Sequence, residues 1–313
     1  MKINKAILLF ILCILLCSCS HEQTEDIYIL YTNDVASAID ENFGYAGVKG
    51  YKDYLETDHK YVALVDAGDY FDGRIATSDN GHNITSLMNA VGYDVVTLGN
   101  QEFSIGLDNL AENIKEADYD TVSCNIKYIG DGSNPIKAVK PYVIKKFGRV
   151  RIAFIGVTTP ETTTERKQAY EAITKDGVLQ YDFYGGNDGE DLYEQIQSTV
   201  DKARKKAEYV ILIAHLGANS VTEGWSSYDV IRNTYGIDVV IDGHSHSVIS
   251  GEPVLNKTGD LVALTSTGKE FENLGELVLH PDHTVTTTLY PSVYERDAEV
   301  QALVDAVLEE YGD

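Results

Sequence analysis

Short apolar segments alternate with amphipathic ones along most of the chain, and this alternation limits the possible folds more than any other feature. Apolar residues recur at helical spacing in 107–114 and 192–206. Between such segments lie β-branched runs bounded by turn residues, which are predicted to be buried strands. The strand segments are 27–32, 61–66, 95–98, 151–157, 209–214 and 239–242. Strands that alternate with helices predict an α/β core.

The pattern changes in the second half, where strands follow one another directly. A hairpin is predicted for 140–147 and 150–156, and 261–266, 274–280 and 284–290 are strands with almost no helix between them. Such connections predict a mixed sheet or two sheets. Residues 297–311 follow as an amphipathic helix. The 313 residues contain no repeat and no long linker, which favours a single domain.

Composition and charge exclude several classes of protein. The chain has 49 acidic and 25 basic side chains, a formal net charge of −24, and 43% hydrophobic residues. The hydrophobic content is that of a globular protein. The negative charge argues against a nucleic-acid duplex as partner, because phosphate backbones need basic neutralisation.

The first 18 residues are typical of a bacterial export signal. Two lysines precede a short apolar run, 6–16, which is too short for a comfortable permanent membrane span. The run ends in Leu16-Cys17-Ser18-Cys19, which resembles the lipobox of bacterial lipoproteins and implies lipidation of Cys19. We therefore expect residues 19–26 to be a tether and the protein to be lipid-anchored in the bacterial cell envelope, outside the cytoplasm. A plain secretory signal and a single-pass anchor are the alternatives.

Polar side chains follow five of the predicted strands at their carboxyl ends, where ligands gather in α/β sheets. Carboxylates, amides and imidazoles together suit borderline divalent metals, whereas a structural zinc site would use cysteine. An aspartate that bridges two ions would suit phosphoryl transfer. Gly68, Gly99 and Gly243 are expected to turn the backbone sharply, so that the next side chain points into the cleft. The polar segments are Asn33-Asp34, 66–69, 99–102, 215–217 and 242–246.

These segments resemble the motifs of the calcineurin-like metallophosphoesterases. The matching residues are Asn33-Asp34, Gly68-Asp69, Gly99-Asn100-x-Glu102-Phe103, His215-Leu216-Gly217 and Gly243-His244-Ser245-His246. Two further motifs, Gly92-Tyr93-Asp94 and 156–162, are typical of the 5′-nucleotidase branch, which includes bacterial UDP-sugar hydrolases and 2′,3′-cyclic-nucleotide phosphodiesterases. The resemblance covers residues 27–295. It implies a four-layer α/β/β/α sandwich of two mixed sheets with a two-metal centre between them.

The resemblance implies one complete metal site and one incomplete site. In the second site Asp69 bridges the ions, and the remaining ligands are Asn100, His215 and His244. The first site keeps Asp34, Asp69 and His246, but Ala36 replaces a family histidine and its methyl group cannot ligate. Whether one or two ions bind, and whether they are Mn, Fe, Zn, Mg or Ca, stays open.

The motif that carries catalysis also departs from the family. The family pattern Asn-His-Glu-Phe-Asp is here Asn100-Gln101-Glu102-Phe103-Ser104. The family histidine is implied to stabilise the transferring phosphoryl group or to protonate the leaving oxygen, with the aspartate orienting it. Gln101 can donate a hydrogen bond but has no proton to give near neutral pH. Asn100 and Gln101 are thus the candidate catalytic residues, and Ser104 is expected to cap the helix near Leu107.

Full-length members of the family carry a C-terminal domain whose paired aromatic residues stack the nucleotide base. The sequence ends at Asp313, just past residues 296–313, which resemble the linker helix. We therefore expect the C-terminal nucleotide-binding domain to be absent. The apolar face of the helix, Val300 to Leu308, would pack on the parent domain or on a partner.

Three functions are compatible with these residues. The first is a metal-dependent phosphoester hydrolase for nucleotides or other phosphomonoesters and diesters, weakened or altered because loss of a general acid costs ~10²–10⁴ in rate. The second is a catalytically impaired lipoprotein that binds metal and phosphate or a nucleotide. The third is the catalytic half of a split nucleotidase, which docks a separate C-terminal domain protein on Val300–Leu308.

Overall fold

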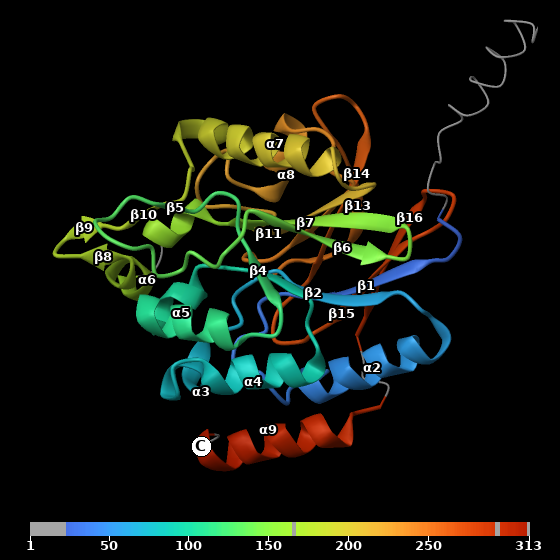
Figure 1. Ribbon diagram of the computed structural model, residues 1–313, viewed down its shortest axis with the longest axis horizontal. Helices are drawn as coiled ribbons and strands as arrows, with labels where there is room; N and C mark the ends of the chain where they lie inside the picture. Colours follow the sequence, from blue (N-terminus) through green and yellow to red (C-terminus); the bar gives the residue numbers. More distant parts are fainter. Residues whose placement is uncertain (1–22, 165–166, 292–294, 312–313) are drawn as a thin grey trace, which may run out of the picture.

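The computed structural model describes residues 23–164, 167–291 and 295–311 (Figure 1). The export signal and Cys19 lie outside these residues, so their assignment stays a prediction. Among the described helices, none combines the length and the apolar character that a membrane crossing requires.

Two six-stranded mixed sheets form the centre of the molecule. The first contains β1 (Ile27–Thr32), β2 (Val62–Asp66), β3 (Val95–Thr97), β4 (Asp120–Val122), β15 (Leu274–Leu279) and β16 (Val285–Tyr290), in the order β16-β15-β1-β2-β3-β4. The second contains β6 (Tyr142–Phe147), β7 (Val150–Thr158), β11 (Tyr209–His215), β12 (Val239–Asp242), β13 (Val248–Leu255) and β14 (Leu261–Thr267), in the order β13-β14-β12-β11-β7-β6. The strands β1 to β4 run parallel, as do β7, β11, β12 and β14.

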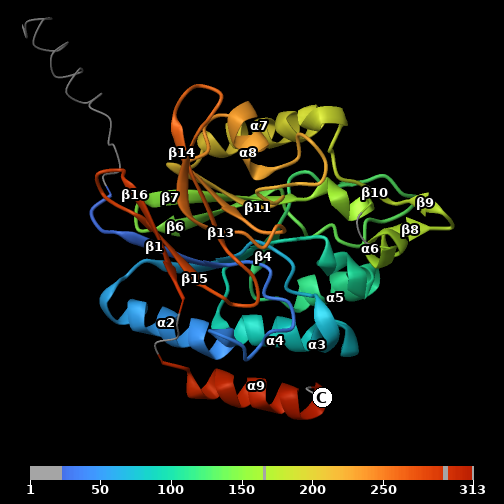
Figure 2. The same ribbon diagram turned by 180° about the vertical axis from the view of Figure 1, so that it is seen from behind.

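Helices cover the outer face of each sheet (Figures 1 and 2). On the first sheet lie α2 (Gly44–Asp58), α3 (Gly73–Ser78), α4 (His82–Val91) and α5 (Leu107–Glu116). On the second lie α7 (Glu190–Arg204) and α8 (Ser227–Asn233). The predicted four-layer α/β/β/α sandwich is therefore confirmed.

Three apolar clusters fill the three interfaces between these layers. Successive side chains of β1 belong alternately to two of these clusters, as the two-residue period of a strand requires. Leu30 packs toward the helices, and Ile29 packs toward the second sheet. The strands β2 and β3 alternate in the same way. Because both faces of each strand are buried, the sequence shows continuous apolar runs in place of an apolar–polar alternation.

Short elements join β7 to α7 near the carboxyl ends of the strands. They are η2 (Pro160–Thr163), α6 (Lys167–Ala172), β8 (Thr174–Lys175), β9 (Val178–Leu179), β10 (Tyr181–Asp182) and η3 (Asn187–Gly189). The strand β10 pairs with β5 (Lys127–Tyr128), and α6 packs on η1 (Gln101–Ile105). This connection therefore borders η1, which begins with the candidate catalytic residue Gln101.

The C-terminal helix α9 (Ala298–Tyr311) forms a further layer against α2, α3 and α4 (Figure 1). Val300, Val304 and Val307 are buried in the same apolar cluster as the helices beneath them, and Leu308 packs against it. Of the two predicted positions for this face, the structure shows packing on the parent domain. The side of Val300–Leu308 that faces α2, α3 and α4 is therefore not available to a separate domain. That such a domain docks on this protein stays a prediction.

Candidate metal centre

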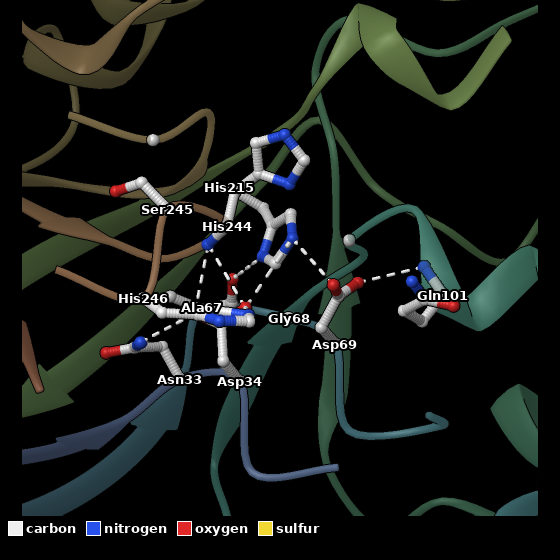
Figure 3. Close-up of polar contacts among 12 residues, drawn as sticks. Asn33, Asp34, Ala67, Gly68, Asp69, Gln101, His215, His244, Ser245 and His246 are labelled. Carbon is white, nitrogen blue, oxygen red and sulfur yellow. Dashed lines mark hydrogen bonds and ion pairs between the residues drawn. The ribbon is translucent and has the colours of Figure 1, made fainter. Parts of the chain in front are cut away.

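The carboxyl ends of the parallel strands meet between the sheets, and the polar residues that follow them come together there (Figure 3). Asp34 follows β1, Asp69 follows β2, and Asn100 follows β3. From the second sheet, His215 is the last residue of β11 and His244 follows β12. Loops far apart in sequence thus supply one site.

Three side chains have the spacing of metal ligands. One ligand atom from each of Asp69, His215 and His244 lies within 4.8 Å of the others. The Nε2 atom of His215 is 3.2 Å from Oδ2 of Asp69, and both side chains are largely buried. Within residues 23–164, 167–291 and 295–311, this is the one such cluster of His, Cys, Asp and Glu.

Two buried polar atoms at this cluster have no hydrogen-bond partner. They are Oδ1 of Asn100 and Nε2 of His215, which lies 3.2 Å from Oδ2 of Asp69. Buried polar atoms are normally paired, because an unpaired one costs about 1–3 kcal/mol. A carboxylate, an amide oxygen and two imidazoles are a donor set that borderline divalent cations accept. The residues present therefore fit a divalent cation.

The tautomer of His215 is set by its backbone contact. Its Nδ1 lies 2.7 Å from the carbonyl oxygen of Ala67. Because a carbonyl oxygen only accepts, Nδ1 must carry the proton, and Nε2 then faces Asp69 as a potential ligand. The imidazole is held in the orientation that ligation requires.

The first-site residues are less closely grouped. Oδ1 of Asp34 lies 3.6 Å from Nε2 of His246 and 3.9 Å from Nε2 of His215, but the His246 side chain is 51% exposed. Asp34, Asp69 and His246 do not form a second cluster of ligand spacing among the described residues. Ala36 lies beside Asp69, since its amide donates to the Asp69 carbonyl over 3.1 Å.

Three buried carboxylates surround the buried His215. Burial raises the pKa of Asp34 to about 7, and burial with nearby Asp69 raises the pKa of Glu102 to about 7. Burial alone would lower the pKa of His215, but Asp69 and Asp34 raise it to about 10. His215 in turn outweighs the effect of burial and lowers the pKa of Asp69. A divalent cation would balance this buried negative charge.

The backbone is left-handed at five positions of the site. The φ angles are 52° at Asp34, 50° at Ala36, 62° at Asp69, 76° at His244 and 53° at His246. Side chains other than glycine rarely adopt such angles, and they persist where the surrounding structure enforces them. Here the amide of Asp34 donates to the Gly68 carbonyl over 2.9 Å, which ties the two loops together. Four of the five positions carry a predicted ligand.

Gln101 and Ser104 contact each other within η1. The backbone N–H of Gln101 donates to Oδ1 of Asp69 over 2.8 Å, and Oγ of Ser104 donates to the side-chain Oε1 of Gln101 over 3.3 Å. The prediction that Ser104 caps the next helix is wrong, because Gly106 precedes α5 and no side chain caps it. Position 104 instead supports the side chain of residue 101.

Two glutamates of the site received no role from the sequence. Glu102 is fully buried, and it accepts from the amides of Asp69, Phe71 and Gly99 over 3.0, 3.0 and 2.6 Å. It therefore fixes the loops that carry Asp69 and Asn100. Glu161 lies 2.9 Å from His244; burial opposes its charge, but the hydrogen bond with His244 lowers its pKa. In the sequence, only their positions inside the motifs 99–103 and 156–162 indicated that these two glutamates belong to the site.

Two of the three glycines at the site are explained by the lack of room for a side chain, and not by a need for a positive φ. Gly68 has the predicted turn conformation, with φ at 94°. Gly99 and Gly243 do not have a positive φ, so the predicted reason is wrong for them. A Cβ atom on Gly99 would lie 2.2 Å from Oδ1 of Asp69 and 2.8 Å from Nε2 of His215. Gly99 therefore keeps room for the ligands.

Gly99→Ala should weaken binding of Mn²⁺ at least about tenfold, because the added methyl group displaces Asp69 and His215, and misplaced ligands cost about 10–100-fold in affinity. Isothermal titration with Mn²⁺ measures the effect. Ser104→Ala, which removes a hydroxyl in the same loop, is the control and should bind Mn²⁺ like the parent. Equal affinity in Gly99→Ala would mean that the cation does not bind between Asp69 and His215.

Comparisons with known proteins identify the lineage of this arrangement. The sequence profile of the family described as "Bacterial capsule synthesis protein PGA_cap" matches residues 62–263, more than half of the chain. The trifunctional nucleotide phosphoesterase protein YfkN of Bacillus subtilis is 31% identical over 212 residues, covering 59% of this chain and 13% of that protein. A snake venom 5′-nucleotidase from Gloydius brevicauda is 30% identical over 250 residues, covering 73% of this chain and 38% of the relative. The chain thus spans less than half the length of these relatives.

Solved structures agree at the level of the fold. A 5′-nucleotidase precursor from Thermus thermophilus superimposes with a TM-score of 0.77 at 21% identity, covering 91% of this chain and 59% of that one. The calcineurin-like phosphoesterase YfkN from Bacillus subtilis gives a TM-score of 0.71 at 22% identity, covering 92% and 98%. The PGA_cap profile, the 5′-nucleotidase relatives of this chain and the shared fold all agree. The chain therefore belongs to the calcineurin-like metallophosphoesterases.

Proposed function

We propose that the protein is a metal-dependent phosphoester hydrolase that acts on nucleotides or other phosphomonoesters and diesters. The observation that carries the proposal is the gathering of Asp69, His215 and His244 within 4.8 Å at the strand ends. The names of the relatives, a nucleotide phosphoesterase and 5′-nucleotidases, support the substrate class. Weakened turnover is part of the proposal, because Ala36 and Gln101 replace groups that the family uses.

The residues have separate tasks in this proposal. The cation would be held by Asp69, Asn100, His215 and His244, and when bound it would neutralise charge that develops on the phosphoryl oxygens. Glu102 holds the Asp69 loop in place through backbone amides. Gln101 would donate a hydrogen bond to the phosphoryl group but supplies no proton. Leaving groups of low pKa, such as aryl oxides, should therefore react best.

The proposal places the enzyme in the bacterial cell envelope, held by lipid on Cys19. Its support is the lipobox resemblance at 16–19. Binding of metal and phosphate without turnover is the second candidate, and the replacements at Ala36 and Gln101 favour it. The split-nucleotidase hypothesis needs a docking surface other than the covered face of α9.

Addition of Mn²⁺ to protein stripped with EDTA should raise the melting temperature, because a ligand that binds only the folded state stabilises it by about 2.7 kcal/mol at about 100 times its dissociation constant. Differential scanning fluorimetry measures the shift. The same samples, assayed with p-nitrophenyl phosphate and then AMP, separate the two candidates. Stabilisation with turnover supports the hydrolase, stabilisation without turnover supports capture, and no stabilisation contradicts both.

A further inference from the structure

We propose that Glu161 is a positioning residue that fixes which nitrogen of His244 faces the cation and ties the 216–226 loop to the metal centre. This inference rests on the proposed metal site. Glu161 lies in η2, directly after β7, and touches two elements of the site at once. It is not itself expected to touch metal or substrate.

Both carboxylate oxygens of Glu161 are engaged. Oε2 lies 2.9 Å from Nε2 of His244, and Oε1 accepts from the amide of Thr222 over 2.8 Å. The Glu161 side chain is 1% exposed, so water does not compete for these contacts. A buried carboxylate that accepts hydrogen bonds through both oxygens has little freedom to move, so it can hold its partners in a defined orientation.

The contact with Glu161 sets the tautomer of a neutral His244. A carboxylate accepts and does not donate, so in a neutral His244 Nε2 carries the proton and Nδ1 is the nitrogen with the lone pair that a cation would require. His215 has the opposite arrangement, in which Nδ1 is the donor, to Ala67, and Nε2 is the ligand atom. With a cation bound, the site would therefore hold its two imidazoles in opposite tautomers, each through one acceptor outside the ligand set.

The second contact of Glu161 reaches a loop at the edge of the site. The 216–226 loop joins β11 to α8. At its start, Oδ1 of Asp242 accepts from the amides of Leu216 and Gly217 over 3.3 and 3.2 Å. Farther along, the loop is joined to η2 by the hydrogen bond from the Thr222 amide to Oε1 of Glu161. The same side chain, Glu161, thus contacts both His244 and this loop.

Glu161→Gln tests the inference, because an amide cannot accept at both ends. Whichever way the amide is turned, its NH₂ group faces either the Nε2–H of His244 or the N–H of Thr222. We expect the Mn²⁺ dissociation constant to rise about 10–100-fold, while the melting temperature of the metal-free protein changes little. Glu223→Gln removes a charge from the same loop without touching His244 and should bind Mn²⁺ like the parent.

The tautomer of His244 is a readout that distinguishes loss of positioning from a general structural defect. In protein labelled with ¹⁵N-histidine, we expect the His244 signals of metal-free parent protein to show a protonated Nε2. Loss of that pattern in Glu161→Gln is the expected result. Glu161→Asp keeps the carboxylate at shorter reach and should give an intermediate Mn²⁺ affinity; it also serves as the test if the glutamine variant does not fold.

The outcomes separate this inference from the proposed function. If the parent binds no Mn²⁺, the proposed function fails first. If the parent binds Mn²⁺, but Glu161→Gln and Glu161→Asp bind it equally well with an unchanged His244 tautomer, Glu161 is not a positioning residue and the proposed function stands.

Discussion

Asp69→Ala should abolish Mn²⁺ binding and turnover together. Asp69 is a buried carboxylate whose Oδ2 lies 3.2 Å from the Nε2 of His215 and whose Oδ1 accepts from Gln101. Its removal takes away the charge that draws the cation into the site. Loss of several kcal/mol of charge stabilisation corresponds to a fall of at least ~10³ in kcat/KM. Steady-state assays with p-nitrophenyl phosphate and calorimetric titration with Mn²⁺ measure the two effects.

Asp72→Asn is the matched control for this experiment. Asp72 lies three residues further along the same loop and caps α3 by accepting from the Gly73 amide. An asparagine keeps the cap and removes one negative charge. Parent-like turnover and binding are expected. Asp69→Ala protein that still hydrolysed the substrate at the parent rate would show that the chemistry occurs elsewhere.

Ala36→His combined with Gln101→His should raise turnover by ~10²–10⁴, because the second change supplies a general acid and the first restores an imidazole ligand beside Asp69. Position 36 already has φ at 50°, a conformation in which histidine is enriched relative to most residues. Ser104 lies within 3.3 Å of the residue 101 side chain. Adding Ser104→Asp should therefore increase the gain by orienting the new imidazole.

The choice of substrate provides the control for the restored variant. A general acid matters most for leaving groups of high pKa. The gain should therefore be larger with AMP than with p-nitrophenyl phosphate in parallel assays. A variant that binds Mn²⁺ tightly but is no faster than the parent with either ester would rule out the assigned roles of positions 36 and 101.

The strands could be predicted from the sequence because they are buried on both faces. The first predicted strand, 27–32, has the same bounds as β1, and the other five begin or end within one residue of β2, β3, β7, β11 and β12. Such runs are short, apolar and β-branched, so local composition is enough. The hairpin at 140–156 could be predicted for a different reason. Its first strand, β6, is only partly buried, but Gly148-Arg149 marks the turn between the two strands.

Elements with weak local signals escaped prediction. The helix α2 has three glycines and three tyrosines among its 15 residues, which obscures its apolar face. The edge strand β13 contains Gly251 and Pro253 and changes register between Ile249 and Glu252, so its alternation breaks. In both cases packing on a neighbour decides the structure, and no local pattern records it.

The grouping of three predicted ligands, Asp69, His215 and His244, could be predicted from the sequence, whereas the residues that support them could not. Asp69, His215 and His244 follow apolar strands and are chemically distinctive. Glu102 and Glu161 act by accepting from backbone amides and from an imidazole that lie far away in sequence. Such roles depend on three-dimensional contacts alone, and a glutamate in a loop has no local pattern that announces them.

The left-handed turn at Ala36 has a consequence for engineering this site. Alanine gains nothing from that conformation, yet the hydrogen bond from the Ala36 amide to the Asp69 carbonyl holds the main chain of residue 36 beside Asp69. An imidazole placed there by substitution would therefore start from a main chain that already has the left-handed turn, and would require no new loop.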